Sequence, residues 1–277
     1  MRIKAAFVLF LLTLAALATT RAQQQTAPTT TSSTTSSSTT APAAMPSCPE
    51  LATAMTAVVR NDARVRDWAE LARYRDANRS VGAPAAGESR VVFLGDSITD
   101  AWPQPRFGEF FPGKPYIGRG ISGQTTPQML IRFRPDVIDL HAKAVVILAG
   151  TNDIAANIGP MTDEEIEGNL ASMAELGKTH HIKVVLSSIL PVSEYHTSPT
   201  GVPQTTRRPM TRIRAINDWM KKYAAAEGHV YLDYFPAMID DKGLLRAEFS
   251  ADDLHPNAAG YAAMAPPAEA AIKQALK

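Results

Sequence analysis

The sequence has very little cysteine: Cys48 is the single one in 277 residues. A single cysteine excludes a disulfide within the chain and any metal site built from several cysteines. Cys48 is either a free thiol in a linker or a means of pairing two chains, and we favour the free thiol. None of the six histidines lies in a His-Glu-x-x-His motif, and the adjacent His180 and His181 are better explained as solvated residues at a helix end. We therefore expect no metal and no cofactor.

Long hydrophobic runs are equally scarce. One run extends from Ala5 to Ala18 and follows two basic residues, which is typical of an export signal over residues 1–22, cleaved near Ala22 or after Ala18. The run is too short to cross a bilayer comfortably, for which about 20 residues are needed. No second run of that length follows, so we expect a secreted or periplasmic protein without stable membrane insertion. Cys48 lies too far from either cleavage site for a lipid-anchored amino terminus.

A strong charge of either sign is also missing. The formal net charge is +1, and the first 22 residues contribute three bases and no acids to it. The rest of the chain is nearly neutral, which gives no reason to expect nucleic acid or another polyanion as a partner. The oligomeric state is left open.

The part of the chain before the main domain has two further segments. Residues 23–47 contain 14 serines or threonines and no charge, so they are expected to form a disordered linker. Residues 50–79 are predicted to be helical, with an interruption near Arg60 where Asp62 can cap a second helix. The apolar residues that mostly share one face are Leu51, Met55, Val58, Val65, Trp68, Leu71 and Tyr74. We interpret residues 48–88 as a helical N-terminal extension packed on the main domain, residues 89–277.

The main domain alternates short apolar runs with helical periodicities. The predicted strands are residues 90–94, 116–117, 144–148, 183–187 and 229–232, the second being the weakest. Between them lie helices, of which one starts with a capping box of Thr162 and Glu165 and another includes residues 213–223. This alternation predicts the α/β class: three α/β/α layers around a mainly parallel five-stranded sheet. The active site of such a fold lies at the carboxyl ends of the strands.

Two of these strands end in residues that could do chemistry. Gly95, Asp96 and Ser97 follow the first strand, where a serine could be displayed as a nucleophile, although Gly-Asp-Ser is also ordinary turn chemistry. Asn152 follows the strand at 144–148. Its amide could donate to a developing oxyanion, or it could simply satisfy loop backbone groups together with Asp153. Each signal alone is weak.

Two other segments could complete a site. Asp252 and His255 are three residues apart, so one turn of chain can bring the carboxylate to the imidazole, as a general base requires; the alternative is a surface pair at a helix start. Small residues in 118–126 leave the backbone amide of Gly123 open to an anion. Phosphate is disfavoured as that anion, because the Walker lysine and the dinucleotide glycine spacing are both missing.

In combination the four segments are far more specific. They resemble the motif blocks of the SGNH (GDSL) hydrolases, which appear here as Gly95-Asp96-Ser97, Gly123, Gly150-Thr151-Asn152-Asp153 and Asp252-x-x-His255. The resemblance covers about residues 90–276 and looks closest to the catalytic subunits of intracellular platelet-activating-factor acetylhydrolase and their bacterial relatives. No Gly-x-Ser-x-Gly motif occurs, which argues against the nucleophile elbow of the α/β-hydrolases.

The resemblance implies a flavodoxin-like SGNH hydrolase fold and a site built from five residues. Ser97, His255 and Asp252 would form a catalytic triad. The amides of Ser97 and Gly123, with the side chain of Asn152, would form the oxyanion hole.

Two positions depart from the family pattern. Gln124 stands where relatives often have Asp, and Asp253 stands where a small residue is common. Asp253 competes for the role of the triad acid, but the family's three-residue spacing favours Asp252.

The implied activity is hydrolysis of a small-molecule or glycan ester with a short acyl group, acetyl above all. The alternatives are a carbohydrate O-acyltransferase, a lysophospholipase and a catalytically silent glycan-binding module, the last disfavoured by the complete catalytic set. The irregular residues 193–209 follow a strand at the active edge and could shape the pocket. Within them, Arg207 and Arg208 are expected to be a solvated pair rather than contacts for an anionic substrate.

Overall fold

The computed structural model describes residues 53, 55, 56, 58, 65–196 and 200–277. These residues belong to one compact unit, Cys48–Lys277. The predicted export signal (1–22), the predicted linker (23–47), Cys48, Leu51 and Asp62 lie outside the described residues.

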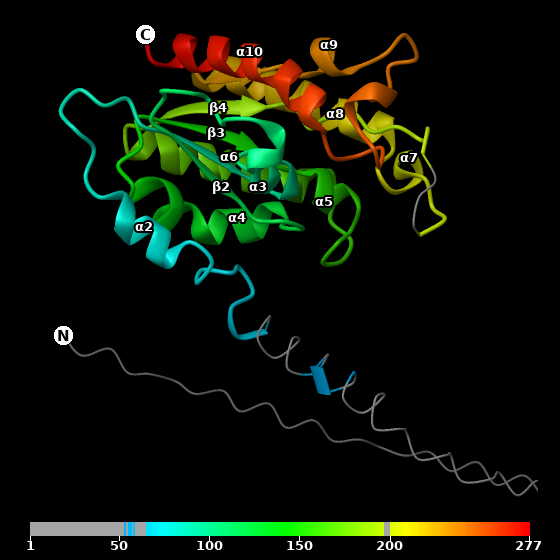
Figure 1. Ribbon diagram of the computed structural model, residues 1–277, viewed down its shortest axis with the longest axis horizontal. Coiled ribbons are helices and arrows are strands. Elements are labelled where there is room, and N and C mark those ends of the chain that lie inside the picture. Colours follow the sequence, from blue (N-terminus) through cyan, green and yellow to red (C-terminus); the bar gives the residue numbers. More distant parts are fainter. Residues whose placement is uncertain (1–52, 54, 57, 59–64, 197–199) are drawn as a thin grey trace, which may run out of the picture. The chain divides into compact units, whose positions relative to one another are not determined.

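A five-stranded parallel sheet forms the centre of the fold, as the sequence predicts (Figure 1). The strands are β1 (Val91–Gly95), β2 (Tyr116–Gly120), β3 (Ala144–Leu148), β4 (Lys183–Ser187) and β5 (Val230–Leu232). Their order, β2-β1-β3-β4-β5, is that of flavodoxin-like sheets. The weakly predicted strand at 116–117 extends to Gly120 because it pairs with β1 along its whole length.

The helices connect the strands and cover both faces of the sheet. The longer helices are α2 (Arg75–Val81), α4 (Thr126–Phe133), α6 (Asp163–Thr179), α8 (Met210–Glu227) and α10 (Ala258–Ala275). The short ones are α3 (Ser97–Ala101), α5 (Thr151–Ile154), α7 (Gln204–Arg207) and α9 (Phe235–Met238), with single turns at Pro105–Phe107, Arg134–Ile138 and Ala247–Phe249. The capping box at the start of α6 is confirmed, since Thr162 and Glu165 each accept from the other's backbone N–H.

The core has two halves because successive strand residues point to opposite faces. Val92 and Leu94 of β1 pack in a cluster with α4, α6 and α8. Val91 and Phe93 pack in a second cluster with α3 and α10. Figure 1 shows α10 and α4 on opposite sides of the sheet. The continuous apolar sequence of the strands thus follows from burial on both faces.

The N-terminal extension departs from its prediction. The second of the two predicted helices is not continuous up to residue 79: residues 67–74 are not helical, and α2 begins only at Arg75. The predicted apolar face is not buried either, because Met55, Val58 and Val65 are between 67% and 81% exposed. Hydrogen bonds attach the described extension to the main domain instead, including one from the Tyr74 hydroxyl to the Gly120 carbonyl.

The strand register sets up the functional edge. Gly95 pairs with Gly120 on one side and with Leu148 on the other, so β1, β2 and β3 end at the same level. The chain segments that follow these three strands therefore meet at one edge of the sheet, where β1 lies between the strands that come after it in the sequence. This is the topological switch point at which open α/β sheets bind ligands.

Candidate active site

Ser97 is the first residue of α3, directly after β1. The turn is tight: a Cβ on Gly95 would lie 2.1 Å from Thr99 Oγ1 and 2.8 Å from the Leu148 carbonyl, so only glycine fits there. Asp96 caps α3 by accepting from the Ile98 N–H at 2.9 Å. The serine is therefore presented at a helix N-terminus on a turn that packing holds rigid.

His255 and Asp252 lie in the turn before α10. The Ser97 Oγ is 2.9 Å from His255 Nε2, and His255 Nδ1 is 2.6 Å from Asp252 Oδ2. The other Asp252 oxygen accepts from the backbone N–H groups of Leu254 and His255. The structure thus brings together the three residues that the sequence proposes as a triad. Their catalytic roles stay a prediction.

These contacts stabilise the ionised form of Asp252. Partial burial alone would raise the pKa of Asp252, but the hydrogen bonds and charge of His255 outweigh it and hold the pKa well below its usual range. An ionised Asp252 accepts a hydrogen bond from the N–H of His255 Nδ1 and so keeps the proton on that nitrogen. The imidazole Nε2 is then left as the acceptor that faces Ser97.

Asn152 is buried in α5, after a left-handed turn at Gly150 with φ of 116°. Its Nδ2 donates to the Gln124 carbonyl at 3.0 Å. Its Oδ1 accepts from Asn157 Nδ2 at 2.9 Å and lies 3.5 Å from Arg208 Nη2. The carbonyl of the amide is therefore fully engaged, while one N–H of Nδ2 has no acceptor among the residues that the structure describes.

Gly123 lies on the exposed loop after β2, with φ of 82°. Within the described part of the chain its N–H has no hydrogen-bond partner. The Asn157 Nδ2, which contacts Asn152, is 3.5 Å from the Gly123 carbonyl. Gly123 and Asn152 are thus linked through Asn157, and both keep an N–H donor available.

Arg208 corrects one expectation. Arg207 is exposed as predicted, but Arg208 is buried. Its Nε donates to both oxygens of Thr151 at 3.0 Å, and Nη1 donates to Gln204. Burial lowers the pKa of Arg208 to about 10, so it stays charged at neutral pH. Arg208 has no periodic signal in its proline-rich segment, and its partners Thr151 and Asn152 are more than 50 residues away, so the sequence did not reveal this role.

The two neighbouring aspartates have different partners. Asp253 has a φ of 66°, which turns its buried side chain away from His255. It accepts from the Ser193 hydroxyl at 2.6 Å and from the His196 N–H at 2.8 Å. Burial would raise the pKa of Asp253, but these hydrogen bonds lower it. Asp253 therefore holds the start of the 193–209 segment, while Asp252 contacts the histidine.

Asp96 is a buried carboxyl group beside the serine. Its Oδ2 has no hydrogen-bond partner among the described residues, and burial raises the pKa of Asp96 to about 6. The charges of His255 and Arg208 lower this pKa, although less than burial raises it.

A second buried arginine, also missed from the sequence, ties β1 to β2. Arg132 of α4 donates at 2.8 Å to the carbonyls of Gly95 and Arg119, and at 2.9 Å to Asp136. Its Nε donates to Gln124 Oε1 at 2.6 Å. Burial lowers the pKa of Arg132, and the Asp136 charge opposes this shift. These contacts fix the loop that carries Gly123.

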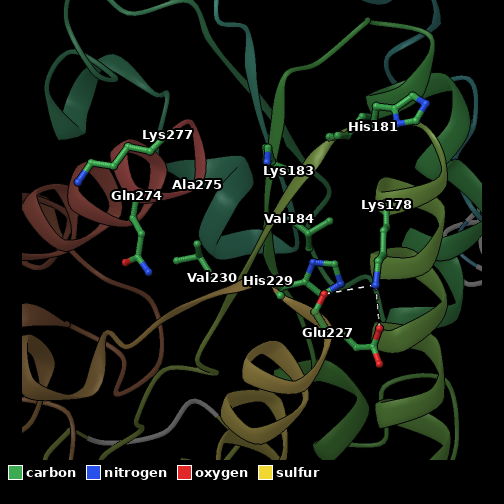
Figure 2. Close-up of a pocket in the computed structure, with 12 residues that line it drawn as sticks. Lys178, His181, Lys183, Val184, Glu227, His229, Val230, Gln274, Ala275 and Lys277 are labelled. Carbon is green, nitrogen blue, oxygen red and sulfur yellow. Dashed lines mark hydrogen bonds and ion pairs between the residues drawn. The ribbon is translucent and has the colours of Figure 1, made fainter.

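The opposite edge of the sheet also has a cavity, of about 610 Å³. It lies where β4 and β5 begin, so it is remote from the Ser97 edge. Figure 2 shows Lys178 paired with Glu227 beside His229, and the two charged atoms are 3.0 Å apart. His180 and His181 are exposed, and no group of three or more metal-ligating side chains occurs among the described residues.

Comparison with known proteins connects this geometry to a family. Residues 93–263 match the model of the GDSL-like lipase/acylhydrolase family. A Bacteroides fragilis structure assigned as an acylhydrolase is similar at 38% identity and a TM-score of 0.69, over 76% of this chain and 99% of that one. A Streptococcus pneumoniae structure assigned as a platelet activating factor has 26% identity and a TM-score of 0.65, over 79% of this chain and 99% of that one.

A more distant relative bears on location. The "Uncharacterized lipoprotein YqeF" of Bacillus subtilis is 33% identical over 81 residues, which make up 28% of this chain. The match spans only a third of the length of that relative. In the described part of this chain, no helix combines the length and the apolar character needed to cross a membrane.

Proposed function

Because the chain belongs to the GDSL-like lipase/acylhydrolase family and is a carboxylic ester hydrolase, we propose that it is an exported serine esterase that removes short acyl groups, acetyl above all. One observation carries the mechanistic part of this proposal: the unbroken hydrogen-bonded chain from Ser97 through His255 to Asp252. A serine, an imidazole and a carboxylate in this order are what nucleophilic acyl transfer requires.

In the proposed reaction, Ser97 Oγ attacks the ester carbonyl carbon while His255 Nε2 takes its proton. Asp252 stabilises the imidazolium that forms. The tetrahedral intermediate then collapses, the carbon–oxygen bond to the alcohol breaks, and His255 returns the proton to that alcohol. Water attacks the acyl-serine with His255 again as the base, which releases the acid and restores Ser97.

The negative charge on the former carbonyl oxygen would be held by three donors. These are the backbone N–H groups of Ser97 and Gly123 and the free N–H of Asn152. The Ser97 amide is at the start of α3, where backbone N–H groups lack helical partners. Arg208 supports the third donor, because a cation on the Oδ1 side of Asn152 orients and polarises its amide.

Two arguments support the substrate and the location. The resemblance to acetylhydrolases favours an acetyl group over a long acyl chain. The basic residues and apolar run at 1–22 favour export, as does the distant relative named a lipoprotein. Esters outside the cytoplasm, such as acetylated polysaccharide, are then the accessible substrates.

The proposal is tested with nitrophenyl esters graded from acetyl to dodecanoyl. We expect the acetyl ester to be cleaved fastest, and Ser97→Ala to lower turnover by a factor on the order of 10⁴ or more. Ser172→Ala is the matched control, because this serine lies in the middle of α6 and its hydroxyl donates to the Gly168 carbonyl of the same helix. Wild-type turnover by Ser97→Ala would overturn the scheme, and a flat rate between roughly pH 5 and 8 would remove histidine from the role of base.

A second arm separates hydrolysis from transfer. Adding a sugar acceptor to the acetyl ester should leave free acetate as the product. Acetylated sugar in place of acetate would instead assign an O-acyltransferase on the same site.

A further inference from the structure

A small cavity adjoins the proposed oxyanion hole. It has a volume of about 240 Å³, and Gly123 lies in its wall. The N-terminal extension supplies Trp68 and Glu70 to the same cavity, and the loop after β3 supplies Asn157 and Ile158. Gly123 itself and Asn157, which contacts Asn152, line the cavity, so it adjoins two of the groups that would hold the reacting ester.

The extension is fixed firmly at this place. The side chain of Gln128 donates to the Trp68 carbonyl at 2.7 Å, and that of Gln124 donates to the Ala69 carbonyl at 2.8 Å. An ionised carboxylate at position 124 would have no N–H to donate to this carbonyl. Gln124 therefore attaches the extension to the Gly123 loop.

The backbone of this segment points its large side chains outward. Ala69 between them is buried, whereas Trp68 is 41% exposed and Glu70 is exposed with a φ of 54°. Asp67 accepts from the N–H groups of Leu71 and Ala72 and so stabilises the turn. Of these two residues only Glu70 has a left-handed backbone, and the exposed Trp68 indole and Glu70 carboxylate both lie in the cavity wall, where they are accessible to a ligand.

The chemistry of the walls indicates a sugar. The Trp68 indole and the 42% exposed Ile158 offer apolar surface to the C–H faces of a pyranose ring. Glu70, Asn157 and Ser122 offer carboxylate, amide and hydroxyl groups to its hydroxyls. The Glu70 carboxylate in the cavity wall would repel a phosphate headgroup, whereas Asp100, which accepts from Ser122 at 2.8 Å, is paired with Arg73.

We propose that Trp68 and Glu70 form a sugar-binding subsite, which holds one ring of an acetylated oligosaccharide while its acetyl group reaches Ser97. This inference rests on the proposed esterase function and gives the N-terminal extension a part in substrate selection. Trp68 stacks against the ring, and Glu70 accepts hydrogen bonds from its hydroxyls.

The test compares Trp68→Ala and Glu70→Gln on two kinds of substrate. For partially O-acetylated xylotriose and cellotriose, we expect kcat/KM to fall about tenfold in Trp68→Ala, mainly through KM, and less in Glu70→Gln. For nitrophenyl acetate, which has no sugar ring, both variants should keep wild-type rates. Leu71→Ala is the matched control, because Leu71 is also 41% exposed but does not line the cavity.

A conservative variant and a binding measurement test the subsite further. Trp68→Phe should restore most of the oligosaccharide activity, and Trp68→Ala in the Ser97→Ala background should weaken binding of the same oligosaccharides in calorimetry. The subsite is overturned by equal losses on both kinds of substrate, by no loss on either, or by a loss confined to lysophospholipid. A wild-type protein that leaves nitrophenyl acetate intact would instead refute the proposed esterase itself.

Discussion

The two edges of the sheet differ in how deeply their charged side chains are buried. At the carboxyl edge, Asp96, Asp153 and Arg208 are buried and have shifted pKa values. At the amino edge, Lys178 and Glu227 pair in solvent, with side chains that are 59% and 44% exposed. The amino edge has the cavity of about 610 Å³, larger than the cavity of about 240 Å³ beside Gly123.

The difference shows that cavity size does not locate the chemistry. Burying a charge is costly, and folded chains accept that cost where the charge has a task. The carboxyl edge has such charges around a serine that contacts an imidazole, and the amino edge has an ordinary surface ion pair. If this comparison is right, substitutions at the carboxyl edge should change catalysis strongly, while those at the amino edge should not.

The largest effect should separate the two adjacent aspartates. Asp252→Asn should lower kcat for nitrophenyl acetate by roughly 10⁴, because His255 would then lose the partner that fixes its tautomer. Asp253→Asn is the matched control and should lower it far less, since the hydrogen bonds of Asp253 go to residues 193–196, including the His196 imidazole, and not to His255. Equal losses of kcat in steady-state assays of both variants would contradict the assignment of different roles to the two aspartates.

The next effect concerns the oxyanion donors. Asn152→Ala should lower kcat by about 10²–10³ with little change in KM, because the lost hydrogen bond strengthens only in the transition state. Arg208→Gln should have a smaller effect in the same direction.

The double variant sharpens this test. If Arg208 acts through Asn152, adding Arg208→Gln to Asn152→Ala should cost little more. Losses that simply multiply would assign Arg208 an independent role, and thermal melts show whether each variant is folded.

A change in stability should follow at Asp96. Its pKa in the folded protein is raised from 3.8 to about 6, so the charged form destabilises the fold as pH rises through about 6. Asp96→Asn removes this penalty. The free energy of unfolding of the variant should therefore increase relative to that of the wild type between pH 4 and pH 8, so that the variant gains about 3 kcal/mol of stability at most. Denaturant titrations at both pH values measure this, and a pH-independent difference would contradict it.

The smallest effect is expected at the amino edge. Lys178→Ala should change the free energy of unfolding by about 0–1 kcal/mol and leave kcat/KM for the acetyl ester unchanged, because an exposed ion pair contributes little. A marked loss of activity would give this edge a part in the reaction and break the comparison.

The sheet could be predicted well from the sequence. Its strands are apolar on both faces, so runs such as Val91–Leu94 and Ala144–Leu148 stand out without any knowledge of partners. The proximity of Ser97 to His255 was also predictable, but it came from family motifs, since 158 residues separate the two. From local patterns alone, each motif could also be explained by an ordinary structural role, such as a turn or a surface pair.

The rest depended on tertiary contacts that no local pattern encodes. The spacing of Met55, Val58 and Val65 predicts an apolar face, but spacing does not say whether a partner covers it. Arg208 is buried because Thr151 and Asn152 lie across from it. The roles of Asp252 and Asp253 are separated by the left-handed backbone of Asp253, a conformation that aspartate adopts more readily than most residues but that the sequence does not assign to one of two adjacent aspartates.

The most direct test of the central claim is to identify the atom that becomes acylated. The protein would be treated with a fluorophosphonate, which labels activated serines, and the labelled peptide sequenced by mass spectrometry. We expect one label on Ser97, lost in Ser97→Ala and slowed in Asp252→Asn. A label on another serine, or undiminished labelling of Ser97→Ala, would contradict the assignment of the carboxyl edge as the active site.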